Sequence, residues 1–148
     1  AGARASRQGM TCCVLDASLA VELALYPRKA GFQRLLNVFH VTGVAVPGIW
    51  HWEFTNVMLK HERRRRTPWH ETDAAIDEIR MLVWHTEEMD GATAASQLTA
   101  QARSRYITLF DAAHLQLAIE MDLPLATLDA GLGAAAELAG VALYPLTP

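Results

Sequence analysis

Long apolar runs are missing from this chain of 148 residues. None approaches the roughly 20 residues that a membrane-spanning helix needs, so no transmembrane segment is expected. The first nine residues carry Arg4 and Arg7 but no apolar core, so no secretory signal is expected either. We expect residues 1–9 to be a disordered leader or a remnant of expression, with Met10 as the natural start. Residues 10–148 then form one domain, with enough apolar residues for a core.

Cysteine is also scarce, because Cys12 and Cys13 are the only two. They fall in a short apolar run, residues 12–15, that predicts a buried strand. Neighbours on a strand point to opposite faces, so an ordinary disulfide between them is not expected. Free thiols in a core are typical of a reducing compartment, which predicts a cytoplasmic protein. No further cysteine exists to complete a metal or redox site.

Positive charge is limited as well. Lysine occurs only as Lys29 and Lys60, and the formal net charge is −3, or −5 without Arg4 and Arg7. A broadly basic surface for nucleic acid is therefore excluded, and any such contact must come from a local patch. The candidate is the run Arg63–Arg66. It is either a solvated helix end, where cations are favourable, or a contact for RNA phosphates.

The chain does contain an alternation of short apolar strands and amphipathic helices. Strands are predicted at residues 12–15, 44–46, 125–127 and 141–144, and helices at residues 18–26, 31–40, 49–66, 69–84, 90–104, 111–121 and 132–138. Ser18 is expected to cap the first helix. Strands that alternate with helices favour a mainly parallel sheet covered by helices on both faces, which is an α/β fold.

Four carboxylates fall at the edges of these elements. Two follow predicted strands and two lie in the first turns of predicted helices: Asp16, Asp129, Glu53 and Asp111. Open parallel sheets bind ligands at the carboxyl ends of their strands, so we expect the four to converge there. Buried charges of one sign need a counter-charge, and Mg²⁺ or Mn²⁺ prefers oxygen ligands. Such a cluster can polarise a phosphate and activate a water molecule.

Each acid taken alone also has a simpler interpretation. Asp16 and Asp111 suit helix caps. Asp129 suits a turn before Gly131, and Glu53 suits a solvated helix position. All four acids nevertheless fall at strand ends or helix starts, which favours a shared site.

Four motifs follow one another in order: Val14-Leu15-Asp16-Ala17-Ser18, Glu53 after Val46-Pro47, Phe110-Asp111-Ala112-Ala113-His114-Leu115-Gln116-Leu117-Ala118, and Leu125-Ala126-Thr127-Leu128-Asp129. Together they resemble the PIN-domain family, and specifically the VapC toxins of bacterial toxin–antitoxin pairs, from Met10 to about Leu146. The resemblance implies a PIN-like three-layer α/β/α sandwich. It also implies a Mg²⁺- or Mn²⁺-dependent endoribonuclease that inhibits translation.

The resemblance assigns roles to particular residues. The family's metal-binding acids carry over to Asp16, Glu53, Asp111 and Asp129. The first three are expected to bind the principal ion, and Asp129 to hold a second ion or orient the water. Ser18 and Thr127 would orient carboxylates or water. His114 departs from the Tyr of many relatives, and we interpret it as a helix residue near the site.

The resemblance also implies partners. These are an RNA substrate, a second copy of the chain in a homodimer, and a VapB-like antitoxin that inserts a basic side chain among the acids and alone contacts DNA. Trp52 lies off the apolar stripe of helix 49–66, which indicates an exposed patch for such a partner.

Other functions fit the residues less well or stay open. A haloacid-dehalogenase-like phosphatase needs a second Asp where this chain has Ser18, and a receiver-type phospho-acceptor needs paired acids and a strand-terminal lysine. A non-catalytic PIN scaffold that binds only RNA or protein stays open, and the sequence does not specify which RNA is bound or cleaved.

Overall fold

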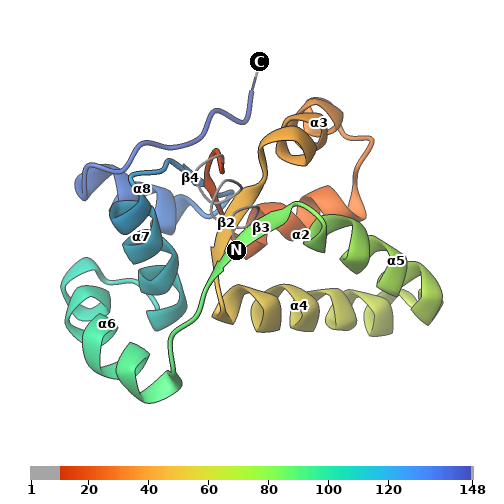
Figure 1. The fold of residues 1–148 in the computed structure, drawn as a ribbon. Helices are drawn as coiled ribbons and strands as arrows, with labels where there is room; N and C mark the ends of the chain where they lie inside the picture. The colour runs from red at the N-terminus through yellow and green to blue at the C-terminus, as the bar shows by residue number, and fades with distance from the viewer. Residues whose placement is uncertain (1–10, 148) are drawn as a thin grey trace, which may run out of the picture.

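A four-stranded parallel sheet forms the centre of the molecule (Figure 1). The computed structural model describes residues 11–147, so the expectations for residues 1–9 and for Met10 lie outside the described part. The strands are β1 (Val14–Leu15), β2 (Val44–Pro47), β3 (Val83–Glu87) and β4 (Leu125–Ala126), in the order β3-β2-β1-β4. Every pairing is parallel, which confirms the predicted α/β architecture.

Helices connect the strands and cover the sheet. In the described chain they are α2 (Ala17–Leu25), α3 (Phe32–Thr42), α4 (Ile49–Arg65), α5 (Trp69–Arg80), α6 (Gly91–Arg105), α7 (Leu109–Met121) and α8 (Ala130–Leu138). Apart from α5, their bounds agree with the predicted ones to within two residues. None of these helices combines the length and apolar character needed to cross a membrane.

Alternating side chains of the sheet divide the core into two layers. Leu15 and Val46 belong to a cluster with residues of α2, α3, α4 and α5. Val14 and Ala45 belong to a second cluster with residues of α7 and α8. Because successive strand residues point to opposite faces, these helices cover the two sides of the sheet. The result is the expected three-layer α/β/α sandwich.

One buried stripe anchors α4, the long helix that follows β2 (Figure 1). Trp50, Phe54 and Met58 recur at helical spacing and are all buried. The rings of Trp50 and Phe54 stack with their centroids 4.8 Å apart. This packing fixes the rotation of α4 about its axis, and therefore the direction in which Glu53 projects.

The strand β3 is absent from the sequence prediction, which extends a helix from residue 69 to residue 84. The helix α5 instead ends at Arg80, and the chain then pairs with β2 from Val83 to Glu87. Gly43 explains part of this difference. It has a φ of +69°, and a Cβ atom at this position would collide with the ring of Trp84 in β3. Leu82 and Val83 are therefore apolar because they enter the sheet, not because they continue the helix.

Two of the predicted strands are shorter than expected or absent. β1 begins at Val14, so both cysteines precede it, and their Sγ atoms lie 3.8 Å apart. The prediction that Cys12 and Cys13 lie in a strand is therefore wrong, whereas both are free thiols, in agreement with the expectation that no disulfide joins them. The predicted strand 141–144 is reduced to one bridge between Leu143 and Leu125.

Candidate functional site

The sheet topology gathers the four predicted acids at one edge. Asp16 directly follows β1, and Asp129 lies shortly after β4, the parallel neighbour of β1. Glu53 lies in the second turn of α4, which follows β2 on the other side of β1. Asp111 lies in the first turn of α7. Carboxyl ends of parallel strands and the helices that start there share one edge, as expected.

Asp16 is the most enclosed of these acids, with 5% of its surface exposed. It occupies the N-cap position of α2, but its side chain makes no capping hydrogen bond. Its Oδ2 atom instead accepts hydrogen bonds from Ser18 Oγ at 2.6 Å and Thr127 Oγ1 at 2.7 Å. The interpretation of Asp16 as a simple helix cap is therefore wrong, because its carboxylate is held by side chains from two elements.

Ser18 and Thr127 also tie Asp16 to the loop after β4. Ser18 Oγ accepts a hydrogen bond from the Leu128 amide, and Thr127 Oγ1 accepts one from the Asp129 amide, both at 3.0 Å. Each hydroxyl has one proton, which it donates to Asp16, so the 3.3 Å separation of the two hydroxyls is a contact only. Ser18 lies inside α2, and the prediction that it caps this helix is wrong.

Glu53 carries a half-buried carboxyl group near the other acids. Burial raises its pKa, and the charges of Asp16 and Asp111 raise it further, while His114 opposes the shift. Its Oε1 atom is buried and makes no hydrogen bond within the described chain. A solvated helix position, the simpler interpretation of this residue, does not fit an enclosed and unpaired oxygen.

Asp111 is the third residue of α7 and does not cap it. The cap is Thr108, whose Oγ1 accepts a hydrogen bond from the Asp111 amide at 3.0 Å. Burial raises the pKa of Asp111, and Asp16 and Asp129 raise it further, against the opposing effects of His114 and Thr108. Glu53 and Asp111 therefore both respond to Asp16, which shows that the acids form one electrostatic cluster.

Asp129 is the most accessible of the four acids. It is the N-cap of α8, and its Oδ1 atom accepts a hydrogen bond from the Leu132 amide at 3.0 Å. The turn interpretation is therefore correct in part, since this residue does start a helix. Its charge still reaches Asp111, whose pKa it raises.

His114 lies next to Asp16 and is completely buried. Its Nδ1 atom lies 2.8 Å from the carbonyl oxygen of Phe110, one turn earlier in α7, and therefore donates a proton to it. Its Nε2 atom lies 3.8 Å from Asp16 Oδ1 and has no hydrogen-bond partner in the described chain. The sequence places His114 near the site but does not reveal this contact.

Cationic side chains do not neutralise the cluster. In residues 11–147, His114 is the only basic side chain within 4.0 Å of any of the four acids, with its Nε2 atom 3.8 Å from Asp16 Oδ1. No group of three or more His, Cys, Asp or Glu side chains in the same range is placed so that it could hold a metal ion without movement. The donors nevertheless fit a hard divalent cation, because they are carboxylate oxygens of one charge and Glu53 Oε1 is buried without a partner.

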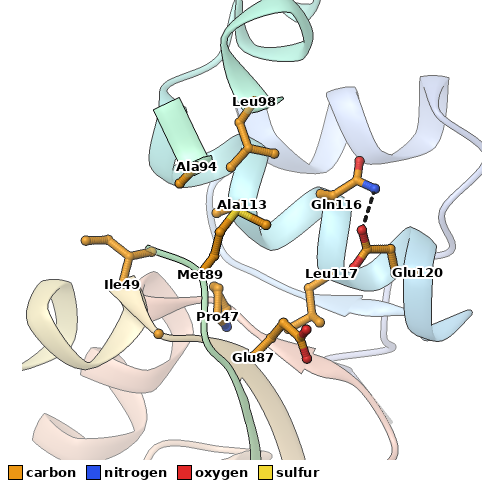
Figure 2. Close-up of a pocket in the computed structure, with 11 residues that line it drawn as sticks. Pro47, Ile49, Glu87, Met89, Ala94, Leu98, Ala113, Gln116, Leu117 and Glu120 are labelled. Atoms are coloured by element: carbon orange, nitrogen blue, oxygen red, sulfur yellow. Dashed lines mark hydrogen bonds between the residues drawn. The ribbon is translucent and has the colours of Figure 1, made fainter. Parts of the chain in front are cut away.

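A separate apolar pocket lies between the start of α4, the loop after β3, α6 and α7 (Figure 2). Ile49, Met89 and Leu98 line it, together with Gln116, which donates a hydrogen bond to Glu120 at 3.0 Å. None of the four acids lines this pocket. The carboxyl groups that do line it belong to Glu87 and Glu120, so this pocket is separate from the acidic site.

Comparison with known proteins agrees with this fold. The profile of the PIN domain matches residues 13–138. The crystal structure of PAE2754 from Pyrobaculum aerophilum is similar, with a TM-score of 0.67 and 20% sequence identity over 88% of this chain and 87% of that chain. At this identity the likeness supports the fold alone. No curated protein matches the chain at a significant level.

Proposed function

This chain belongs to the PIN-domain family, whose members are generally nucleases, and we propose that it is a metal-dependent endoribonuclease. One observation carries the proposal. Asp16, Glu53 and Asp111 come from distant parts of the chain and form one cluster, in which Asp16 raises the pKa values of both others. A cation stabilises like charges that are held together in a partly buried site, and a divalent cation at such a site can promote phosphodiester hydrolysis.

Asp16, Glu53 and Asp111 would hold the ion, with Asp129 beside them. A bound Mg²⁺ or Mn²⁺ supplies Lewis acidity toward a phosphate oxygen and lowers the pKa of water. Ser18 and Thr127 hold Asp16 through Oδ2, which leaves Oδ1 for the ion. Burial and the charges of Asp16 and Asp111 raise the pKa of Glu53 while no cation is present, and a bound ion would favour its charged form, so we assign Glu53 to the ion and not to the proton of the attacking water. Asp129, fixed at the start of α8, orients that water.

RNA binding is supported by the exposed arginines at the end of α4. Arg63, Arg64 and Arg66 are exposed, and Arg65 donates a hydrogen bond to Tyr26 Oη. They lie ten or more residues beyond Glu53 on the same helix, which is about 15–20 Å at 1.5 Å per residue. Bound RNA would therefore extend several nucleotides from the cleaved bond, with its phosphates along α4.

We further propose that the protein is the toxin of a toxin–antitoxin pair in the cytoplasm and forms a homodimer. An exposed apolar groove supports a protein partner. Trp52, Met89 and Phe110 line it, and Trp52 is 78% exposed. Phe110 directly precedes Asp111, so a VapB-like antitoxin segment in this groove could place a basic side chain among the acids and block the ion.

The test of nuclease activity uses the full chain and labelled RNA. We expect cleavage with Mg²⁺ or Mn²⁺, none with EDTA, and at least a 100-fold lower rate in Asp16→Asn, which corresponds to about 2.7 kcal/mol of transition-state stabilisation. Asp73→Asn, at an exposed position of α5, is the matched control and should cleave at the wild-type rate. Wild-type cleavage by Asp16→Asn would refute the assignment. RNA binding without any cleavage would instead support the non-catalytic scaffold.

The toxin role is tested in cells. Induced expression should stop growth, and sequencing of RNA ends should show cuts that Asp16→Asn does not produce. Co-expression of a small protein encoded beside this one should relieve the arrest. Growth that is unaffected by the wild-type chain would contradict the toxin role without affecting the nuclease assignment.

A further inference from the structure

The imidazole of His114 presents an unsatisfied acceptor to the acidic cluster. Because Nδ1 donates its proton to the Phe110 carbonyl, the neutral ring has a lone pair on Nε2. That nitrogen is fully buried and has no hydrogen-bond donor in the described chain. A buried polar atom without a partner costs about 1–3 kcal/mol, so this arrangement needs an explanation.

The surroundings of Nε2 contain acceptors and no donor that reaches it. Asp16 Oδ1 lies 3.8 Å away, and its carboxylate partner Oδ2 already receives both hydroxyl protons of Ser18 and Thr127. Glu53 Oε1 is a further buried oxygen without a partner in the described chain. Acceptors that converge without donors are satisfied together by one cation.

The two atoms are close enough to share an ion after a small movement. Adjacent ligands about 2.1 Å from an octahedral ion lie about 3.0 Å apart. Nε2 and Asp16 Oδ1 lie 3.8 Å apart, so they would approach each other by about 0.8 Å on binding the same ion. In addition, a metal-binding histidine commonly donates its other ring N–H to a backbone carbonyl, as Nδ1 of His114 does to Phe110.

We propose that His114 Nε2 is a direct ligand of the divalent ion at the acidic site. This inference rests on the proposed metal-dependent function and deepens it. A mixed nitrogen and oxygen site favours Mn²⁺ over Mg²⁺, because imidazole is a better ligand for transition metals than for magnesium. His114 therefore determines which ion the site selects, in addition to helping to hold it.

The test is electron spin-echo spectroscopy of Mn²⁺ bound to the full chain, which detects nitrogen coordinated to the ion. We expect nitrogen modulation in the wild-type protein that changes when histidine is labelled with ¹⁵N. His114→Phe should lack this modulation and should lose at least tenfold of the preference for Mn²⁺ over Mg²⁺ in equilibrium binding. His40→Phe, at an exposed position of α3, is the matched control and should change neither property.

The possible results separate this inference from the proposed function. If Mn²⁺ binds in an Asp16-dependent manner but shows no histidine nitrogen, His114 is not a ligand and the nuclease proposal stands. If Mn²⁺ binds no better to the wild type than to Asp16→Asn, both proposals fail. The wild-type spectrum decides between these results even if His114→Phe does not fold.

Discussion

Glu53→Gln should make the metal-free protein more stable and the metal-bound protein less stable. In the folded chain, burial raises the pKa of Glu53 above its ordinary value of 4.5, and the charges of Asp16 and Asp111 add to this effect. A carboxyl group with a raised folded pKa contributes stability below its unfolded pKa and loses that contribution as the pH rises through the folded pKa. At pH 8 the charged Glu53 is therefore unfavourable without a cation, and glutamine removes the charge at nearly constant shape.

The two effects have different sizes. Without metal at pH 8, we expect Glu53→Gln to raise the free energy of unfolding by at most about 1 kcal/mol, because the side chain is partly exposed and screened. For the wild type, Mn²⁺ at 100 times its Kd adds about 2.7 kcal/mol. At roughly 2–4 °C per kcal/mol, this raises the Tm by about 5–10 °C. The variant lacks one ligand, so the order of the two proteins should reverse when Mn²⁺ is added.

Urea unfolding at pH 8 and at pH 4, with EDTA or with Mn²⁺, measures both effects. At pH 4 the group is mostly protonated in both states, so the difference between the metal-free proteins should become small. Glu78→Gln, at an exposed position of α5, is the control and should follow the wild type throughout. The reasoning is refuted if Glu53→Gln is clearly less stable than the wild type at pH 8 in EDTA, because the charge would then be making a favourable contact.

Two further results are expected. Thr127→Val removes the hydroxyl that donates a hydrogen bond to Asp16 and accepts one from the Asp129 amide. The variant should lower kcat for RNA cleavage about 10-fold or more, with little change in KM. An unchanged kcat would contradict the positioning role of Thr127. Iodoacetamide at pH 7 should modify Cys12 before Cys13. A hydrogen bond with Cys13 lowers the pKa of Cys12 to about 6, whereas the pKa of the buried Cys13 is raised. Equal labelling of the two cysteines in a peptide mass spectrum would disprove this.

The positions of the acids could be predicted from the sequence because the ends of the strands could be predicted. Asp16 and Asp129 each follow a run of buried apolar residues, and a parallel sheet aligns such ends at one edge. The start of α7 was also recoverable, since Thr108 three residues before Asp111 has the spacing of a capping pair. The prediction that began the helix at Asp111 overlooked this pair.

The strand β3 was harder to predict because local pattern and tertiary context disagree. Leu82 and Val83 continue the apolar spacing of the preceding helix, so periodicity favours one longer helix. The chain leaves the helix because β2 offers an unpaired edge and Gly43 leaves room for the ring of Trp84. Neither condition is local to residues 69–84, so no pattern within that segment could show it.

The hydrogen bonding of His114 is harder still to predict from the sequence. Its spacing from Asp111 places it on the same helix near the site, but only the packed structure shows which ring nitrogen is occupied and which is not. The carbonyl of Phe110 fixes one proton, and the burial of Nε2 removes water as a partner for the other nitrogen. What the sequence presents as a departure from the family motif becomes, in the fold, an acceptor aimed at the same carboxylate that two hydroxyls hold in place. Under the proposal that His114 binds the ion, the choice of ion depends on a residue whose importance arises from its burial and not from its charge.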